Sequence, residues 1–272
     1  MSSYRLLALD MDGTLLTSDK RISPRTLQAM RVAAERGVHV ALSTGRAVTE
    51  LFEYRAQLRG VVRYGSLLSG GLVYDLDRDE RIALRAFEPQ LALRVVAQGL
   101  AEDAMVHVMT DAHSAATRRD VDRMHLLGQG VYQEMFRQQC TFVDDPAAFV
   151  RQQEGHVCKI NLYHPSAEAR ERSRAALAGL PLQPVVGEAA SLELTPAGVS
   201  KALGLELLCA HLGIGLEQCV AVGDAGNDVD ALEAAGLAVA MGNATPEACA
   251  VADARVADND HDGIVEVIER WF

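Results

Sequence analysis

Long hydrophobic runs are absent from the sequence. No apolar stretch approaches the roughly 18 residues that a membrane-spanning helix needs. Only four consecutive apolar residues, 6–9, precede Asp10 near the N-terminus. A secretory leader needs an apolar core of about 7–15 residues. We therefore expect a cytoplasmic protein without a membrane partner.

Basic residues are scarce relative to acidic ones. The chain has 26 Lys and Arg against 37 Asp and Glu, which gives a formal net charge of −11. Because binding along a nucleic-acid backbone needs clustered positive charge, we expect no nucleic-acid partner. A small anionic ligand is not excluded, since a few local cations or a bound metal can reverse the field at one site.

Paired cysteines are also lacking. The five cysteines form no Cys-x-x-Cys pair, and they are Cys140, Cys158, Cys209, Cys219 and Cys249. This usage is typical of a reducing compartment and predicts neither disulfides nor a zinc site. The rest of the composition, 49% apolar and 23% charged over 272 residues, indicates a globular chain of one or two domains.

Short apolar strands alternate with helices at both ends of the chain. Strands are expected at 4–9 and 38–42, around a helix that begins after Ser23 and Pro24 and ends at Gly37. The C-terminal part repeats the alternation, with elements expected at 191–194, 199–212, 218–222, 229–235, 237–240 and 262–271. This pattern predicts an α/β fold with a doubly wound, Rossmann-like parallel sheet.

The middle of the chain follows a different pattern. A hairpin is expected over 72–84, and helices and strands then mix without regular alternation. We therefore expect an α+β domain at 84–188, inserted into a core formed by 1–83 and 189–272.

Polar side chains follow three of the predicted strands. In an open parallel sheet, ligands bind beyond the carboxyl ends of the strands. Convergence of the three ends would bring together Asp10, Asp12, Thr44, Asp224 and Asp228. Carboxylates that close repel one another and need a cation, and hard oxygen ligands favour Mg²⁺.

Lys201 lies where a positive charge is unfavourable for a helix. It follows Ser200, a predicted helix cap, so its positive charge lies in the first turn and opposes the helix dipole. A rule broken without visible compensation often marks a functional site. A phosphate group between Lys201 and the metal would compensate.

Four motifs occur in the order found in the haloacid dehalogenase superfamily. They are Asp10-x-Asp12-Gly-Thr, Ser43-Thr44-Gly-Arg46, Lys201 and Gly223-Asp224-x-x-Asn227-Asp228. The chain most resembles the Cof-type branch of sugar-phosphate phosphatases, which carries a type IIB cap at the place of the insert. Ser69-Gly70-Gly71 departs from the Asn-Gly-Ala that is usual in that branch.

This resemblance implies a division of roles. Asp10 would be the nucleophile that forms an aspartyl-phosphate, and Asp12 the acid that protonates the leaving alcohol and then activates water. Lys201 would neutralise developing charge. The implied phosphate-binding groups are Gly13, Thr44, Gly45, Arg46, Lys201 and Asn227, and the implied Mg²⁺ ligands are Asp10, the Asp12 carbonyl and Asp224, with Asn227 or Asp228 in support.

Several residues keep a second interpretation. Ser43 competes with Thr44, and Asp228 could simply cap the following helix. Arg46 could be a surface residue, and Asn243 lies in a Gly-Asn turn that need not contact the site. In the insert, alternate residues predict a shared strand face, namely His107, Met109, Asp111 and His113. This face could bind a metal or the substrate, or it could be a solvated edge. His107, Asp111, His113 and the Arg118-Arg119 pair are the candidates for contacting the substrate.

One further pattern matches an EF-hand calcium loop. Asp258, Asp260 and Asp262 have its spacing, with Glu269 at the last position. The context is wrong, because a strand is expected upstream and the helix would carry Glu269 away from the aspartates. We interpret the segment as an acidic turn before the last helix.

The favoured function is an Mg²⁺-dependent phosphatase of a small phosphorylated metabolite, acting as a monomer or weak homodimer. A sugar phosphomutase on the same core is the alternative. A phospho-acceptor signalling domain is a third possibility, but such domains usually lack a long insert.

Overall fold

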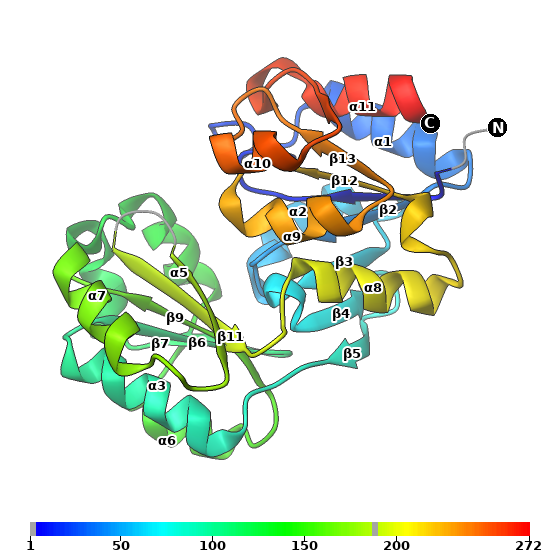
Figure 1. Cartoon of the computed structure of the whole chain (residues 1–272). Helices are drawn as coiled ribbons and strands as arrows, with labels where there is room; N and C mark the ends of the chain where they lie inside the picture. Colours follow the sequence, from blue (N-terminus) through cyan, green and yellow to red (C-terminus); the bar gives the residue numbers. More distant parts are fainter. Residues whose placement is uncertain (1–3, 187–189) are drawn as a thin grey trace. The chain divides into compact units, whose positions relative to one another are not determined.

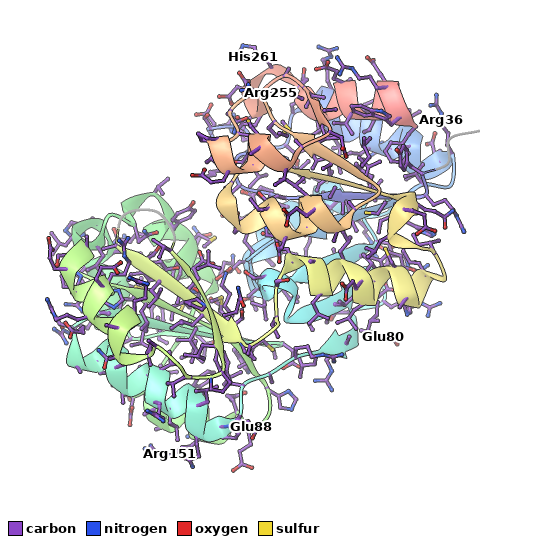
Figure 2. The ribbon with its side chains drawn as sticks, in the orientation of Figure 1. Arg36, Glu80, Glu88, Arg151, Arg255 and His261 are labelled. Atoms are coloured by element: carbon purple, nitrogen blue, oxygen red, sulfur yellow. The ribbon has the colours of Figure 1, made fainter. Side chains whose placement is uncertain are left out.

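The computed structural model describes residues 4–186 and 190–272, which divide into two compact units. Unit 1 consists of Met1–Gly45, Tyr54–Ala83 and Ser200–Phe272, and unit 2 consists of Arg46–Glu53 and Leu84–Val199. The charged side chains labelled in Figure 2 are exposed, namely Arg36, Glu80, Glu88, Arg151, Arg255 and His261. Within the described ranges, no helix has the length and apolar character needed to cross a membrane.

Unit 1 is built on an eight-stranded sheet. Its strands are β1 (Leu6–Leu9), β2 (His39–Ser43), β3 (Tyr64–Leu67), β4 (Leu72–Asp75), β5 (Glu80–Leu84), β12 (Cys219–Gly223), β13 (Leu237–Ala240) and β14 (Ala254–Arg255). They follow the order β14-β13-β12-β1-β2-β3-β4-β5, parallel from β14 to β3 and antiparallel between β3 and β4. The chain order reverses at β1, which pairs with both β12 and β2, and ligands bind at such switch points.

Helices cover both faces of this sheet. They are α1 (Pro24–Glu35), α2 (Phe52–Leu58), α8 (Lys201–Leu212), α9 (Val229–Ala234), α10 (Pro246–Val251) and α11 (Gly263–Trp271). Leu6 and Ala8 share a core with side chains of α8 and α9, whereas Leu7 and Leu9 point to the other face and are fully buried. In Figure 1, α1 and α11 lie on one side of β12 and β13, and α8 and α9 on the other. The predicted doubly wound α/β fold is confirmed.

Two helix boundaries predicted from the sequence are also confirmed. The Ser23 hydroxyl accepts a hydrogen bond from the Thr26 amide at 3.1 Å, and Pro24 begins α1. α8 ends at Gly213, whose φ of 65° is readily adopted by glycine.

Unit 2 contains a six-stranded sheet in the order β10-β11-β9-β6-β7-β8. Its strands are β6 (Met105–Thr110), β7 (Ser114–Ala116), β8 (Thr141–Phe142), β9 (Val157–Tyr163), β10 (Leu182–Val186) and β11 (Ser191–Pro196). Its helices are α3 (Pro89–Ala101), α4 (Arg118–Asp122), α5 (Gln133–Gln139), α6 (Pro146–Gln152) and α7 (Ala167–Ala176). One face of the sheet packs an apolar core against α3 and α6. A smaller cluster with α4 and α5 lies by Met105.

The units differ from the expected domain boundaries in two places. β11, expected in the C-terminal part of the core, pairs with β9 and β10 and therefore belongs to unit 2. Segment 46–53, expected in the core, also falls in unit 2. The expected boundary between 188 and 189 lies outside the described residues.

The expected substrate face of the insert is not one strand face. β6 ends at Thr110, whose hydroxyl accepts hydrogen bonds from the amides of Ala112 and His113. The chain turns there, so Asp111 and His113 do not continue the strand alternation of His107. Arg118 instead lies over the Phe142 ring, with its Cζ 4.0 Å from the centroid.

Candidate active site

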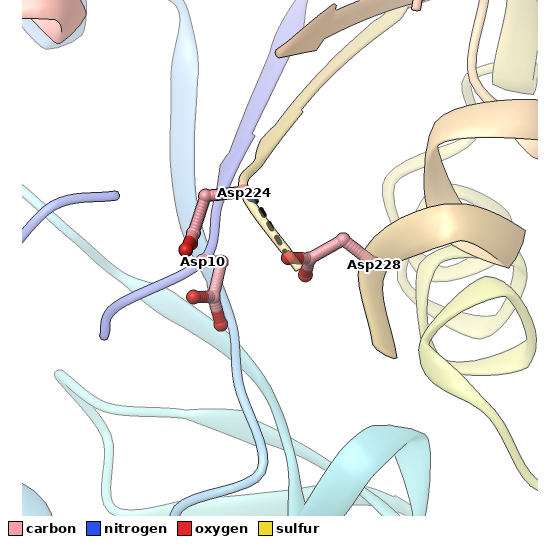
Figure 3. Close-up of side chains that lie close together, drawn as sticks. All are labelled: Asp10, Asp224 and Asp228. Atoms are coloured by element: carbon pink, nitrogen blue, oxygen red, sulfur yellow. Dashed lines mark hydrogen bonds between the residues drawn. The ribbon is translucent and has the colours of Figure 1, made fainter. Parts of the chain in front are cut away.

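Three aspartates converge at the carboxyl ends of β1 and β12. The pairing of Leu9 with Val222 places Asp10 beside the chain that leads to Asp224. Asp228 ends the 3₁₀ turn that follows β12. One carboxylate oxygen from each aspartate lies within 4.8 Å of the other two (Figure 3). The convergence expected from the strand ends is therefore present for these three.

Lys201 bridges two of the three carboxylates. It is the first residue of α8 and is 1% exposed. Its Nζ donates hydrogen bonds of 2.6 Å to Asp10 Oδ1 and of 2.6 Å to Asp228 Oδ1. Although burial lowers the pKa of Lys201, the two carboxylates outweigh burial and raise it above its ordinary value. The lysine thus carries its charge despite complete burial.

Negative charge still exceeds positive charge at this cluster. Burial raises the pKa of Asp10 to about 8, against the contact with Lys201, and Asp228 contributes to the rise. Burial likewise raises the pKa of Asp224 to about 6, and Asp228 again adds to the rise. Three carboxylates around a single ammonium group form an oxygen donor set with uncompensated charge, which fits Mg²⁺.

Hydrogen bonds hold two of these carboxylates in place. Thr14 Oγ1 donates to Asp224 Oδ1 at 2.8 Å. Asp228 Oδ2 accepts from the amides of Asp224 and Ala225, each at 3.0 Å, and Figure 3 shows the first of these bonds. Asp228 therefore fixes the start of the turn while its other oxygen contacts Lys201. Thr14 belongs to the first motif, but its contact with Asp224 is not predicted from the sequence.

Asp12 lies outside the carboxylate cluster. Its Oδ1 accepts a 2.7 Å hydrogen bond from Lys20 Nζ, and both side chains are about one-third exposed, at 31% and 33%. Lys20 has a φ of 57°, and its carbonyl accepts a hydrogen bond from the Tyr54 hydroxyl. The contact of Lys20 with Asp12 is not predicted from the sequence, because no periodic pattern relates the two positions.

The loop after Asp10 requires a glycine at position 13. Gly13 has a φ of 85°, and a Cβ there would lie 2.3 Å from Asp224 Oδ2. Its carbonyl accepts a 2.8 Å hydrogen bond from Asn243 Nδ2. Asn243, left open by the sequence analysis, thus supports the loop that carries the two motif aspartates.

The remaining phosphate-binding candidates occupy different settings. Thr44 is buried, and its amide donates to the Ser66 carbonyl at 2.9 Å, next to Gly45. Its rival Ser43 has a buried hydroxyl without a hydrogen-bond partner among the described residues. The Asn227 Oδ1 is likewise buried and unpartnered within the described ranges.

Arg46 and Ser69 make contacts that the sequence did not predict. Arg46 belongs to unit 2, where its Nη1 lies 3.7 Å from Met135 Sδ, and its phosphate contact stays a prediction. Ser69, at the departure from the family pattern, donates its amide to the Thr44 carbonyl at 3.0 Å.

The carboxylates of the acidic turn near the C-terminus form hydrogen bonds with other groups of the protein. Asp260 accepts hydrogen bonds from the Ser18 amide and hydroxyl at 2.8 and 2.6 Å, and Asp258 contacts His261. Asn259 Nδ2 donates to the Leu16 carbonyl at 2.8 Å. The turn therefore holds the segment that follows the loop of Asp10 and Asp12.

Comparison with known proteins agrees with this geometry. Residues 7–268 match the family described as haloacid dehalogenase-like hydrolase. The chain is 33% identical over 248 residues to an HMP-PP phosphatase of Serratia proteamaculans, covering 90% of this chain and 86% of that protein. It is 28% identical to the 5-amino-6-(5-phospho-D-ribitylamino)uracil phosphatase YitU of Bacillus subtilis, covering 98% and 97%.

A solved structure extends the likeness to the whole fold. A haloacid dehalogenase-like hydrolase from Bacteroides thetaiotaomicron superposes with a TM-score of 0.85 at 25% identity. The match covers 99% of this chain and 100% of that one.

Proposed function

Since the chain belongs to the haloacid dehalogenase-like hydrolase family and is a phosphatase, we propose that it hydrolyses a small phosphate monoester through an aspartyl-phosphate on Asp10, with Mg²⁺ as cofactor. The observation that carries this proposal is the buried set of Asp10, Asp224 and Asp228 around Lys201 at the carboxyl ends of β1 and β12.

The first step is attack by an Asp10 oxygen on the phosphorus atom. The bond from phosphorus to the ester oxygen breaks, and Asp12 gives its proton to the leaving alcohol. In the second step, the Asp12 carboxylate takes a proton from water while the water oxygen attacks phosphorus. The bond to Asp10 then breaks, which releases phosphate and restores both side chains.

Charge around the reacting phosphoryl group is controlled by the buried cluster. Lys201 contacts Asp10 directly and so places a positive charge at the nucleophile. Asp10, Asp224 and Asp228 would hold Mg²⁺, with Asn227 and the Asp12 carbonyl in support. When bound, the ion supplies positive charge to the phosphate oxygens.

The names of the relatives support the proposed substrate class. These names include HMP-PP phosphatase and a phosphoribitylamino-uracil phosphatase, both of which describe small phosphorylated metabolites. We assign substrate selection to unit 2, because all the core motifs except Arg46 fall in unit 1. A sugar phosphate is the favoured substrate.

Product analysis tests this function. The purified protein with Mg²⁺ is expected to release inorganic phosphate from 4-nitrophenyl phosphate and from sugar phosphates. A phosphomutase would instead return an isomerised sugar phosphate. A long-lived aspartyl-phosphate without turnover would indicate a phospho-acceptor domain, and either result would replace the proposal.

Thr14→Val is expected to weaken Mg²⁺ binding about 10- to 100-fold, because the hydroxyl that orients Asp224 is lost while the side-chain volume is kept. The measurement is a Mg²⁺ titration of activity together with calorimetry. Thr17→Val is the control in the same loop, since the Thr17 hydroxyl forms hydrogen bonds only with the Arg21 main chain within the described part of the protein. An unchanged Mg²⁺ affinity in Thr14→Val would remove its proposed role.

A further inference from the structure

A row of polar side chains crosses the sheet of unit 2. His107 on β6 and Glu193 on β11 are each paired with Asn161 on β9, so the three lie side by side on one face. Their strand neighbours, such as Val106 and Ile160, point to the other face and pack in the apolar core. We call His107, Asn161 and Glu193 the polar row; their strands lie together in Figure 1.

His107 presents an acceptor at its Nδ1 atom. Ser114 donates its hydroxyl hydrogen to Glu50 Oε1 at 2.8 Å, so the hydroxyl oxygen can only accept from His107 Nε2 at 2.7 Å. Burial lowers the pKa of His107 to about 4, despite the opposing effect of Glu50, so the ring is neutral near pH 7. The hydrogen therefore resides on Nε2, and Nδ1 carries a lone pair.

Asn161 presents a second acceptor beside the first. Its Nδ2 donates to the Tyr163 hydroxyl at 3.1 Å. Its Oδ1 and the His107 Nδ1 are buried and have no hydrogen-bond partner among the described residues. The two side chains are 6% and 2% exposed. Buried polar atoms are normally paired, so two unpaired acceptors on directly opposite residues are positioned to receive hydrogens from a bound group.

The charges around the row disfavour an anionic ligand. Lys159 Nζ contacts Glu193 Oε2 at 2.5 Å, which balances one carboxylate. Glu50, beside Ser114, adds a second carboxylate to the same cluster. Among the described residues, the charged groups that act on His107 are the carboxylates of Glu50 and Glu193 and the ammonium group of Lys159. This setting suits a neutral or cationic group that carries hydrogen-bond donors.

We propose that the polar row binds the leaving group of the substrate through its hydroxyl or amino hydrogens, with His107 Nδ1 and Asn161 Oδ1 as the acceptors. This inference rests on the proposed phosphatase function and adds the chemistry by which unit 2 selects the substrate. A site built to accept such hydrogens discriminates strongly against esters that lack them, because its buried acceptors would then stay unpaired.

Three phosphate esters test the inference. Glucose 6-phosphate supplies hydroxyl hydrogens, 4-aminobenzyl phosphate supplies amino hydrogens, and benzyl phosphate supplies neither. The measured quantity is kcat/KM for each donor-bearing ester divided by kcat/KM for benzyl phosphate. This ratio does not depend on the fraction of folded enzyme, and the two donor-bearing esters distinguish a polyol from an amine.

His107→Phe and Asn161→Leu remove one acceptor each while keeping much of the side-chain volume. Each is expected to lower the ratio about 10-fold or more for the ester that the wild type prefers. His164→Gln is the matched control: His164 is a buried histidine of unit 2 whose two ring nitrogens contact Ala190 O and Ser173 Oγ. Its ratio is expected to match the wild type.

The outcomes separate the two levels of the proposal. If the wild type hydrolyses none of the three esters or 4-nitrophenyl phosphate, the proposed function fails. If it hydrolyses them without preferring a donor-bearing ester, the inference fails while the function stands. An unchanged ratio in both His107→Phe and Asn161→Leu, even with a lower Tm, would likewise overturn it and make the row purely structural.

Discussion

Asp10→Asn is expected to abolish turnover, with kcat falling by at least about 10⁴-fold, because the amide cannot act as the nucleophile. The fold should persist, since Lys201 keeps its 2.6 Å contact with Asp228. Phosphate release measures the rate, and acid-quenched labelling with a radioactive phosphate ester measures the aspartyl-phosphate. Both signals should be lost together.

Asp12→Asn is the matched comparison for this variant. It also replaces a carboxylate by an amide, but it removes proton transfer and leaves the nucleophile intact. We expect a loss of about 10²–10⁴-fold on alkyl phosphates. The first step should be affected less for 4-nitrophenyl phosphate, whose leaving group needs little protonation. Near-normal turnover of Asp10→Asn would mean that another residue is the nucleophile.

Removal of Mg²⁺ is the second change with a large expected effect. Chelation should lower activity by about 10³-fold or more, because positive charge at the phosphate oxygens is lost. Activity towards 4-nitrophenyl phosphate before and after chelation, with Mg²⁺ added back, measures the effect. Full activity of the metal-free protein would rule out the proposed mechanism.

The affinity for Mg²⁺ should also depend on pH. The pKa values of Asp10, about 8, and Asp224, about 6, are raised by burial and by neighbouring carboxylates, so the metal-free protein retains protons near neutrality. A cation binds the deprotonated carboxylates, so binding releases protons. Affinity should therefore rise between pH 6 and 8.

Calorimetry in two buffers of different ionisation enthalpy measures the released protons directly. Asp111 provides a control outside the cluster, because it contacts His156 in unit 2. Asp111→Asn should leave the proton release unchanged. A constant Mg²⁺ affinity from pH 6 to 8, without proton release, would contradict the assigned charge balance.

The sequence was sufficient to predict the positions of Asp10 and Asp224, because each directly follows an apolar strand and parallel strands place their ends together. Lys201 could be placed for a similar reason, since Ser200 marks the start of α8. These predictions depend on short sequence patterns, namely apolar strands and a helix cap, and the folded structure keeps the elements that these patterns predict.

Other features depend on contacts that no local signal reports. A strand at Ser191–Leu194 is predicted from the sequence, but its pairing with β9 is not. The paired residues, such as Ser191 and Tyr163, lie about 30 positions apart, so no local pattern relates them. Lys20 reaches Asp12 only because the intervening chain turns back. The polar row likewise lies on three different strands. The sequence alone does not show that its residues are neighbours, because this depends on how β6, β9 and β11 pair.

The strand β1 is synthesised long before the strand β12 that pairs with it. Leu6 pairs with Cys219, and Gly13 is held by Asn243, more than 200 residues later. A ribosome releases the N-terminal part of a chain first, and a sheet with such distant pairings is slow to close. Asp10, the proposed nucleophile, is therefore synthesised long before Lys201, Asp224 and Asp228, so an unfinished chain carries Asp10 without the charged residues that surround it in the folded protein.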